Sequence, residues 1–235
     1  MYATLPLGRL VQMLLWSFIV VASIIWLAQG RPATATEVLR VLTMGVTVTG
    51  LLLLVFFGPT GKWSPWRPVW RKLSFLNDFL FPDLNGTWEG VQESNWSKID
   101  AMRKSACSPD HIKADDLDQI ALLQLPITLE IKASLFDLHV YAILPTTDST
   151  SVSAASRLIR SQDGRYILYY VFTQETGLIS STDESVHDGA ARLIFYNATT
   201  ELKGTYWTKR MWQAGLNTAG RLQVTRVDVN RRRFV

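Results

Sequence analysis

Hydrophobic residues fill two long stretches near the N-terminus. Leu10 to Ala28 and Val41 to Phe57 contain no charged residue, and each approaches the roughly 20 residues that a helix needs to cross a bilayer core. The pattern predicts a transmembrane helical hairpin with spans at about residues 10–28 and 38–57. The rival for the first stretch is a cleaved signal peptide, because Arg9 flanks it and small residues follow it, but the apolar run is long for one.

Cations and tryptophans follow the second stretch. The short connection between the two spans holds one arginine and one glutamate, whereas GKWSPWRPVWRKL holds Lys62, Arg67, Arg71 and Lys72. Because cations near the ends of spans remain on the cytoplasmic side, both termini are expected to face the cytoplasm.

Residues 62–81 form a separate linker segment in this interpretation. Trp63, Trp66 and Trp70 are the kind of ring found at a membrane interface, and apolar residues from Val69 to Leu80 recur at helical spacing. A short helix on the lipid headgroups and a linker helix that packs on the following domain remain equal alternatives.

From Thr87 onward the period changes to short, alternating, β-rich runs separated by turn residues. We predict eight strands, at about residues 87–94, 125–133, 136–144, 151–160, 165–173, 190–196, 201–209 and 220–227. Sequential antiparallel strands leave two raw edges unless the sheet closes. An eight-stranded, lipocalin-like up-and-down β-barrel over residues 82–235, after the helical segment 1–61, is therefore the predicted fold, with a β-sandwich as the alternative.

One long connection interrupts this pattern. Residues 95–124 form an acidic insert, with a short helix expected near Asp115 to Leu123.

Alternation predicts which side chains face the interior. In the seventh strand Leu202, Tyr206, Thr208 and Arg210 share one face, and Thr205, Trp207 and Lys209 share the other. In the eighth strand the apolar side carries Leu222, Val224 and Arg226, so we expect Tyr206, Thr208, Arg210 and Arg226 to converge inside the barrel or at its mouth. The facing of the fourth and fifth strands stays open, because both of their faces carry apolar or aromatic residues.

Charge narrows the kind of ligand. The net charge is +4, yet residues 82–201 carry nine cations against seventeen acids, while residues 202–235 carry eight cations against Asp228 alone. An anionic ligand would therefore be bound by the C-terminal segment. The single cysteine, Cys107, excludes an intrachain disulfide.

No catalytic constellation stands out. His111, His139 and His187 are scattered, and metal-binding pairs, nucleophile elbows and phosphate loops are all missing from the sequence. Asp115, Asp116 and Asp118 form a run typical of a solvated loop. We therefore expect no enzyme, no catalytic residue, no metal and no cofactor.

Binding of a small dianion with flat rings is the better hypothesis. Cations would pair with its phosphates and aromatic faces would stack on its bases. The candidate ligand-binding residues are Tyr206, Thr208, Arg210, Arg226, Tyr170, Arg157 and Trp88. For Trp88 a structural alternative is favoured, because a tryptophan in the first strand and an arginine late in the last, here Arg226, close one end of lipocalin-like barrels.

The order of the motifs resembles a known family. Two N-terminal spans, DLNGTWEG at 83–90, HDGAARLIFYNATTELKGTYWTKR at 187–210 and GRLQVTR at 220–226 together resemble the two-transmembrane, β-strand-rich effectors of bacterial CBASS antiphage systems, of the CD-NTase-associated protein 15 type.

The resemblance implies a mechanism. A CD-NTase activated by infection makes a cyclic dinucleotide, the cytoplasmic barrel binds it and oligomerises, and the spans disrupt the inner membrane, which results in abortive infection. The implied partners are this second messenger, the lipid bilayer and further copies of the chain, with a functional link to a CD-NTase and no nucleic-acid polymer. The alternatives are a membrane-anchored lipocalin-like carrier of lipids or fatty acids and a purely structural envelope protein.

Overall fold

The computed structural model describes residues 7–30, 34–58, 64–108, 112–134, 136–196 and 198–227. They belong to two compact units, one made of residues 1–83 with 133–137 and the other of residues 84–132 with 138–235. Lys62, Trp63, His111, the side chain of Arg9 and the tail from Asp228 onward lie outside the described part of the chain.

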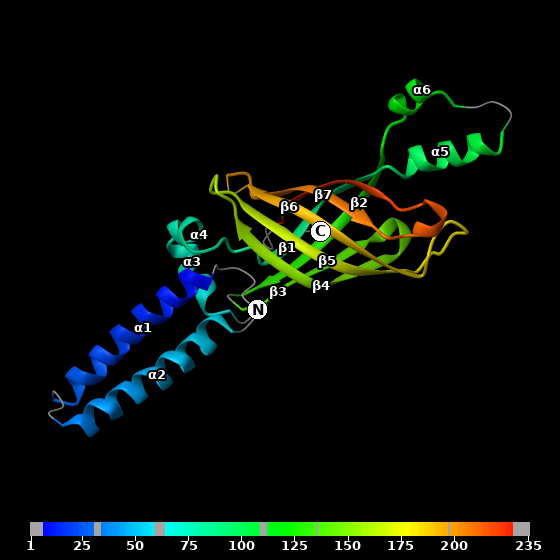
Figure 1. Cartoon of the computed structure of the whole chain (residues 1–235). Helices are drawn as coiled ribbons and strands as arrows, with labels where there is room; N and C mark the ends of the chain where they lie inside the picture. Colours follow the sequence, from blue (N-terminus) through cyan, green and yellow to red (C-terminus); the bar gives the residue numbers. More distant parts are fainter. Residues whose placement is uncertain are drawn as a thin grey trace, which may run out of the picture. The chain divides into compact units, whose positions relative to one another are not determined.

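Two long helices open the first unit. They are α1 (Leu7–Ala28) and α2 (Ala35–Phe57), drawn side by side in blue and cyan in Figure 1. Thr34 caps α2, because its hydroxyl accepts from the Glu37 N–H while the Glu37 carboxylate accepts from the Thr34 N–H. Both helices are long and apolar enough to cross a membrane, judged by length and composition.

One face of α2 is buried in the helix pair. Every fourth residue from Val41 to Phe57 lies on it, including Gly45 and Thr49. Gly45 lets the helices approach closely, since a Cβ there would lie 3.0 Å from the Phe18 ring and 3.4 Å from the Ala22 Cβ. The small residues of α2 are therefore used within the hairpin.

An aromatic cluster stabilises the segment after α2, from Trp66 to Phe81. Helices α3 (Trp66–Lys72) and α4 (Phe75–Phe79) replace the single helix expected there. Trp66 and Trp70 are buried, and their rings lie 5.1 and 5.2 Å from the ring of Phe81. The Trp70 indole N–H also donates to the Phe81 carbonyl at 2.9 Å. These two tryptophans therefore pack against protein.

The second unit is a closed antiparallel barrel, so the predicted fold is confirmed. Its strands follow one another around the barrel in chain order, and β1 closes the sheet by pairing with β8, from Trp88 opposite Arg226 to Ser94 opposite Gly220. The strands are β1 (Gly86–Ser94), β2 (Leu123–Ala133), β3 (Leu138–Leu144), β4 (Ser149–Arg160), β5 (Tyr166–Thr176), β6 (Val186–Tyr196), β7 (Glu201–Thr208) and β8 (Ala219–Arg226).

Alternation holds in the last two strands as predicted. Tyr206, Thr208, Leu222 and Val224 are buried, whereas Trp207 is 50% exposed. The tertiary structure also shows which faces of the fourth and fifth strands point into the barrel. In β5 the even-numbered residues point inward, while in β4 a bulge between Ser153 and Ala155 reverses the parity along the strand.

The insert between β1 and β2 is helical. It contains α5 (Trp96–Ala106) and α6 (Ala114–Gln119), and the two helices lie beyond one end of the barrel in Figure 1. The prediction of a short helix near Asp115 was correct in outline, and α5 was missed. Ile99 is the buried residue of α5. Because so little of this helix is buried, its sequence shows no strong helical repeat of apolar residues.

Candidate functional site

The barrel interior changes from apolar to polar along its axis. At one end, paired inward residues of β5, β6 and β7 are Tyr166, Phe195 and Leu202. Moving along the strands, the successive interior layers contain Leu168, Leu193 and Gly204, then Tyr170, Ala191 and Tyr206, then Phe172, Gly189 and Thr208. The small hydroxyl side chains lie in the last layers, so a polar ligand would find hydrogen-bonding groups at that end.

A cavity of about 350 Å³ lies at this polar end. The loop between β5 and β6, the start of α5 and the chain after β7 all contribute to its wall. Its lining residues are Gln92, Ser94, Trp96, Leu123, Leu125, Leu144, Thr146, Thr147, Ser149, Gln174, Leu178, Ser180, Thr182, Asp183, His187, Thr208, Arg210 and Thr218.

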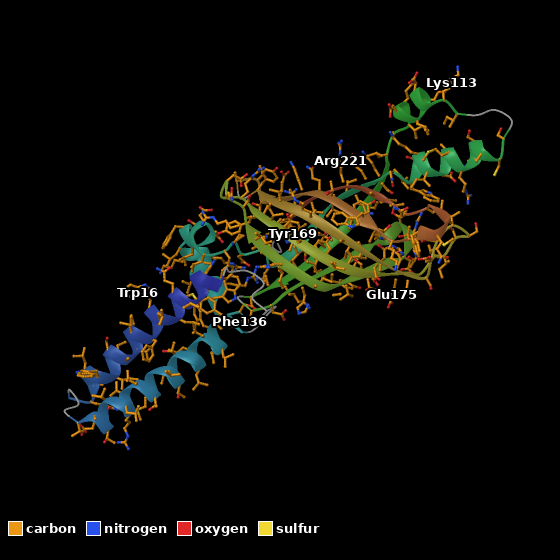
Figure 2. The ribbon with its side chains drawn as sticks, in the orientation of Figure 1. Trp16, Lys113, Phe136, Tyr169, Glu175 and Arg221 are labelled. Carbon is orange, nitrogen blue, oxygen red and sulfur yellow. The ribbon has the colours of Figure 1, made fainter. Side chains whose placement is uncertain are left out.

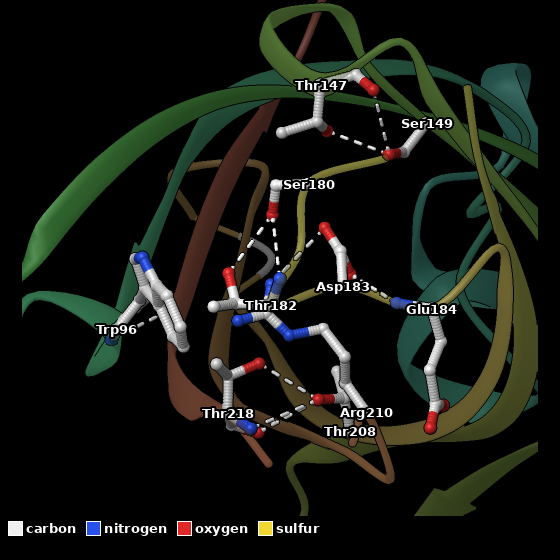
Figure 3. A network of polar contacts seen from close by, with 11 residues as sticks. Trp96, Thr147, Ser149, Ser180, Thr182, Asp183, Glu184, Thr208, Arg210 and Thr218 are labelled. Atoms are coloured by element: carbon white, nitrogen blue, oxygen red, sulfur yellow. Dashed lines mark hydrogen bonds and ion pairs between the residues drawn. The ribbon is translucent and has the colours of Figure 1, made fainter. Parts of the chain in front are cut away.

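Arg210 is the cation of this cavity. Its guanidinium carbon lies 4.4 Å from the centre of the Trp96 ring, and Nη1 lies 3.6 Å from Asp183 Oδ2, as Figure 3 shows. The side chain is 16% exposed, and its Nε and Nη2 atoms are buried without a hydrogen-bond partner among the described residues. A buried guanidinium with two open donors is a ready partner for a planar or tetrahedral oxyanion.

Local backbone geometry places this arginine at the end of β7. Met211 and Gly215 have positive φ angles of 43° and 71°, which reverse the chain beyond the strand. The Lys209 N–H still donates to the Asp188 carbonyl at 2.7 Å. The backbone contact with β6 therefore continues one residue past Thr208, and the side chains of both Arg210 and His187 line the cavity.

Hydroxyl groups line the wall beside Arg210. The hydroxyl oxygens of Thr208 and Thr218 lie 2.9 Å apart, and the Thr218 N–H donates to Thr208 Oγ1 at 3.2 Å. A second hydroxyl pair, Ser180 and Thr182, is 3.0 Å apart in the β5–β6 loop. Figure 3 places both pairs around the guanidinium.

His187 is the histidine among the residues that line the cavity. It is 6% exposed, and its Nδ1 is buried without a hydrogen-bond partner in the described part of the chain. Burial lowers the pKa of His187, with a smaller effect in the same direction from Arg210, against the opposing charges of Asp183, Glu184 and Asp188. The imidazole is consequently neutral near pH 7.

Two predicted tyrosines form the layer beneath the cavity. Tyr170 and Tyr206 both pair with Ala191, and both are buried. Burial raises the pKa of each phenol, and neighbouring Ser94 and Gln92 partly offset this for Tyr206. The structure thus brings four of the candidate residues, Tyr170, Tyr206, Thr208 and Arg210, to one end of the barrel.

The predicted convergence of Arg226 with these residues is wrong. Arg226 pairs with Trp88 in the register of β1 and β8, and its guanidinium carbon lies 4.7 Å from the Trp88 ring. Seven residues of β7 separate that end from Thr208, a distance of about 23 Å. Trp88 is fully buried and donates to the Leu84 carbonyl at 3.0 Å. This geometry agrees with the alternative in which Trp88 and Arg226 close one end of the barrel.

Arg157 lies apart from both ends. It is exposed and pairs with Tyr169 on the outer face of β4 and β5, because the bulge at Ser153 reverses the alternation before it. Figure 2 labels Tyr169 and Arg221, which belong to the same outer face.

Sequence reasoning missed His187, Asp183 and Trp96. For His187 a signal was present, because His187, Gly189, Ala191, Leu193 and Phe195 alternate along β6. The predicted strand began at residue 190, four residues late, and left the histidine in a loop. Nothing in the sequence ties Trp96 or Asp183 to Arg210, since the three lie on segments far apart in the chain.

Among residues 7–30, 34–58, 64–108, 112–134, 136–196 and 198–227, no three His, Cys, Asp or Glu side chains gather where they could hold a metal ion.

Known proteins match this chain over most of the barrel. Residues 113–226 match the family described as Cap15, cyclic dinucleotide receptor domain. The barrel sequence is therefore similar to the Cap15 receptor domain. CD-NTase-associated protein 15 of Escherichia albertii is 29% identical over 185 residues, which cover 78% of this chain and 80% of that protein. The Cap15 resemblance found in the sequence motifs is thereby confirmed.

Proposed function

We propose that this chain is a CBASS effector whose barrel binds a cyclic dinucleotide in the cavity beside Arg210. The observation that carries the proposal is the buried guanidinium with two donors, Nε and Nη2, that have no partner among the described residues. The match to a cyclic dinucleotide receptor family and the similarity to CD-NTase-associated protein 15 support it.

The chemistry of the cavity suits a phosphodiester with attached bases. A guanidinium donates two parallel hydrogen bonds to a phosphate, and each charge-assisted bond contributes about 1.5–3 kcal/mol. Trp96 already stacks on Arg210, so one ring face supports the cation while neighbouring hydroxyls remain for sugar and base edges. Asp183 contacts the third nitrogen, Nη1, so Nε and Nη2 remain available to a phosphate.

The helical hairpin supplies the membrane-acting part of the proposal. The chain would be divided into a transmembrane hairpin at 1–61, a juxtamembrane linker at 62–81 and a cytoplasmic receptor at 82–235, with both termini in the cytoplasm and the spans in the inner membrane. The two candidate spans and the cations that follow them support this arrangement. Disruption of the membrane by gathered spans would then cause abortive infection.

Oligomerisation of the barrels has a candidate surface on the outer face. Register places Ala155, Val171, Ala190, Trp207 and Ala219 in one row across β4 to β8. Val171 and Trp207 are 49% and 50% exposed. An apolar row with an exposed tryptophan is typical of a surface that another barrel covers.

The competing lipid carrier requires an apolar cavity. In the barrel the apolar end is filled by fully buried side chains such as Leu129, Leu168, Leu193 and Leu202. The cavity at the other end is lined by four leucines, but also by hydroxyls, a histidine, an aspartate and an arginine. These features disfavour an acyl chain as the ligand.

A thermal-shift panel of cyclic dinucleotides tests the proposed function. The full chain in detergent should melt at a higher temperature with at least one of them, and size-exclusion chromatography should then detect a larger species. Arg210→Ala should abolish both effects, because it removes the phosphate donors. Arg221→Ala is the matched control, since Arg221 lies on the exposed outer face of β8. A panel without any thermal shift would contradict the proposal.

A further inference from the structure

A cyclic dinucleotide has two phosphates, whereas one arginine lines the described cavity, so one negative charge of the ligand has no cationic partner. A cyclic dinucleotide is a dianion, and the second arginine expected for it, Arg226, lies at the opposite end of the barrel. Arg210 is the only Lys or Arg among the lining residues of the cavity within the described part of the chain. We propose that His187 is the second phosphate-binding group, and that it takes up a proton when the ligand binds.

The position of His187 suits this role. It is paired with Gln174 on the inner face, and both residues line the cavity. Arg210 lies just beyond the end of β7 and lines the same cavity, and the Lys209 to Asp188 backbone bond ties its segment to β6. The imidazole and the guanidinium can therefore serve two phosphates of one small ring.

The unpartnered ring nitrogen is the second observation. His187 is more than nine-tenths buried, and its Nδ1 has no hydrogen-bond partner among the described residues. Buried polar atoms are nearly always paired in native proteins, and an exception often marks a functional group. A phosphate oxygen in the cavity would accept a hydrogen bond from this nitrogen once it carries a proton.

The surrounding charges explain why the proton arrives only with the ligand. In the free protein burial and Arg210 keep the pKa of His187 low, although Asp183, Glu184 and Asp188 act in the opposite direction. Asp188 already accepts a hydrogen bond from Thr173 at 2.9 Å, and Asp183 Oδ1 accepts from the Glu184 N–H at 3.1 Å. A bound dianion adds negative charge beside the imidazole, and it also offsets the positive charge of the Arg210 guanidinium. Both effects raise the pKa of His187 and favour the imidazolium.

The proton comes from the solvent, and no covalent bond changes. Because the complex binds one more proton than the free protein, affinity rises as pH falls and levels off below the pKa of the free protein. The largest possible slope is about tenfold in Kd per pH unit. This inference rests on the proposed function, since it requires that a cyclic dinucleotide occupies the cavity.

Isothermal titration calorimetry of the full chain in detergent measures the proton directly. Cyclic di-AMP, cyclic di-GMP and cyclic di-UMP serve as probes at pH 7.0, in phosphate and in Tris, whose ionisation enthalpies differ. The binding enthalpy of a probe that binds should differ between the two buffers by an amount that indicates net proton uptake, and Kd should decrease from pH 8 to pH 6.

His187→Gln supplies the matched variant, because an amide keeps hydrogen bonding but cannot take a proton. It should bind with a pH-independent Kd, several-fold weaker than the wild type at pH 6, and without proton uptake. His139→Gln, at an exposed position of β3, should behave as the wild type does.

The outcomes separate the two proposals. Binding without proton uptake by the wild-type chain overturns the role of His187 and leaves the proposed function standing. Lack of binding by every probe overturns both. The wild-type buffer comparison decides the matter even where His187→Gln fails to fold.

Discussion

Replacing Trp88 with phenylalanine tests whether the Trp88–Arg226 pair closes the barrel or binds ligand. Trp88 is fully buried, and its indole N–H donates to the Leu84 carbonyl at 3.0 Å. Its ring contacts Phe195 edge-on at 6.1 Å and lies under the Arg226 guanidinium at 4.7 Å. The substitution keeps an aromatic ring but removes the N–H and part of the ring.

The expected loss of stability follows from these contacts. Leaving the buried Leu84 carbonyl without its donor costs about 1–3 kcal/mol. The smaller ring leaves a void and weakens the cation–π contact, for about 1 kcal/mol more. The total is roughly 2–4 kcal/mol, and at roughly 2–4 °C per kcal/mol for a domain of this size the melting temperature should fall by about 4–16 °C.

Far-UV circular dichroism of the full chain in detergent follows the unfolding of the barrel strands. Trp207→Phe is the control, because this tryptophan is half exposed on the outer face, and its melting temperature should stay close to that of the wild type. Ligand affinity of Trp88→Phe should be unchanged, since Ser94 at the cavity lies six positions along β1 from Trp88, a distance of about 20 Å.

The opposite result would refute the structural role. If Trp88→Phe lowered ligand affinity at least tenfold while the melting temperature moved by less than about 2 °C, then Trp88 would contact the ligand and the assignment of the cavity end would be wrong.

Three further substitutions or conditions test the barrel. Gly189→Ala should destabilise it by about 1–3 kcal/mol in urea unfolding, because the added Cβ would meet the Phe172 ring; an unchanged midpoint would contradict this packing. Ser153→Ala should cost about 1–3 kcal/mol, because Ser153 Oγ accepts the buried Val140 N–H at 2.9 Å, and Thr205→Ala on the outer face serves as control. Without ligand, the free energy of unfolding should fall as pH drops below about 6.5, since the pKa of His187 is lowered in the folded state and the unfolded chain binds the proton more readily. His187→Gln should reduce this dependence, and an identical pH profile for both proteins would exclude His187 as its source.

Alternation and composition determined much of this protein from the sequence. Uncharged stretches of helical length predicted α1 and α2, and period-two runs between turn residues predicted all eight strands. The facing of β7 followed from parity alone, which placed Tyr206 and Thr208 inside and Trp207 outside. Such patterns are readable because burial on one face of an element imposes a local period.

Tertiary structure decided what depends on register and on contacts between distant segments. Ser149, Ser151 and Ser153 point inward while Val152 is exposed, an inversion of the usual pattern that the neighbouring strands and the bulge impose. Register likewise carried Arg226 away from Arg210, and the fold brought His187 and Arg210 to the wall of one cavity. Parity states which face a side chain occupies, whereas the height of that side chain along the barrel depends on hydrogen bonding to strands far away in the chain.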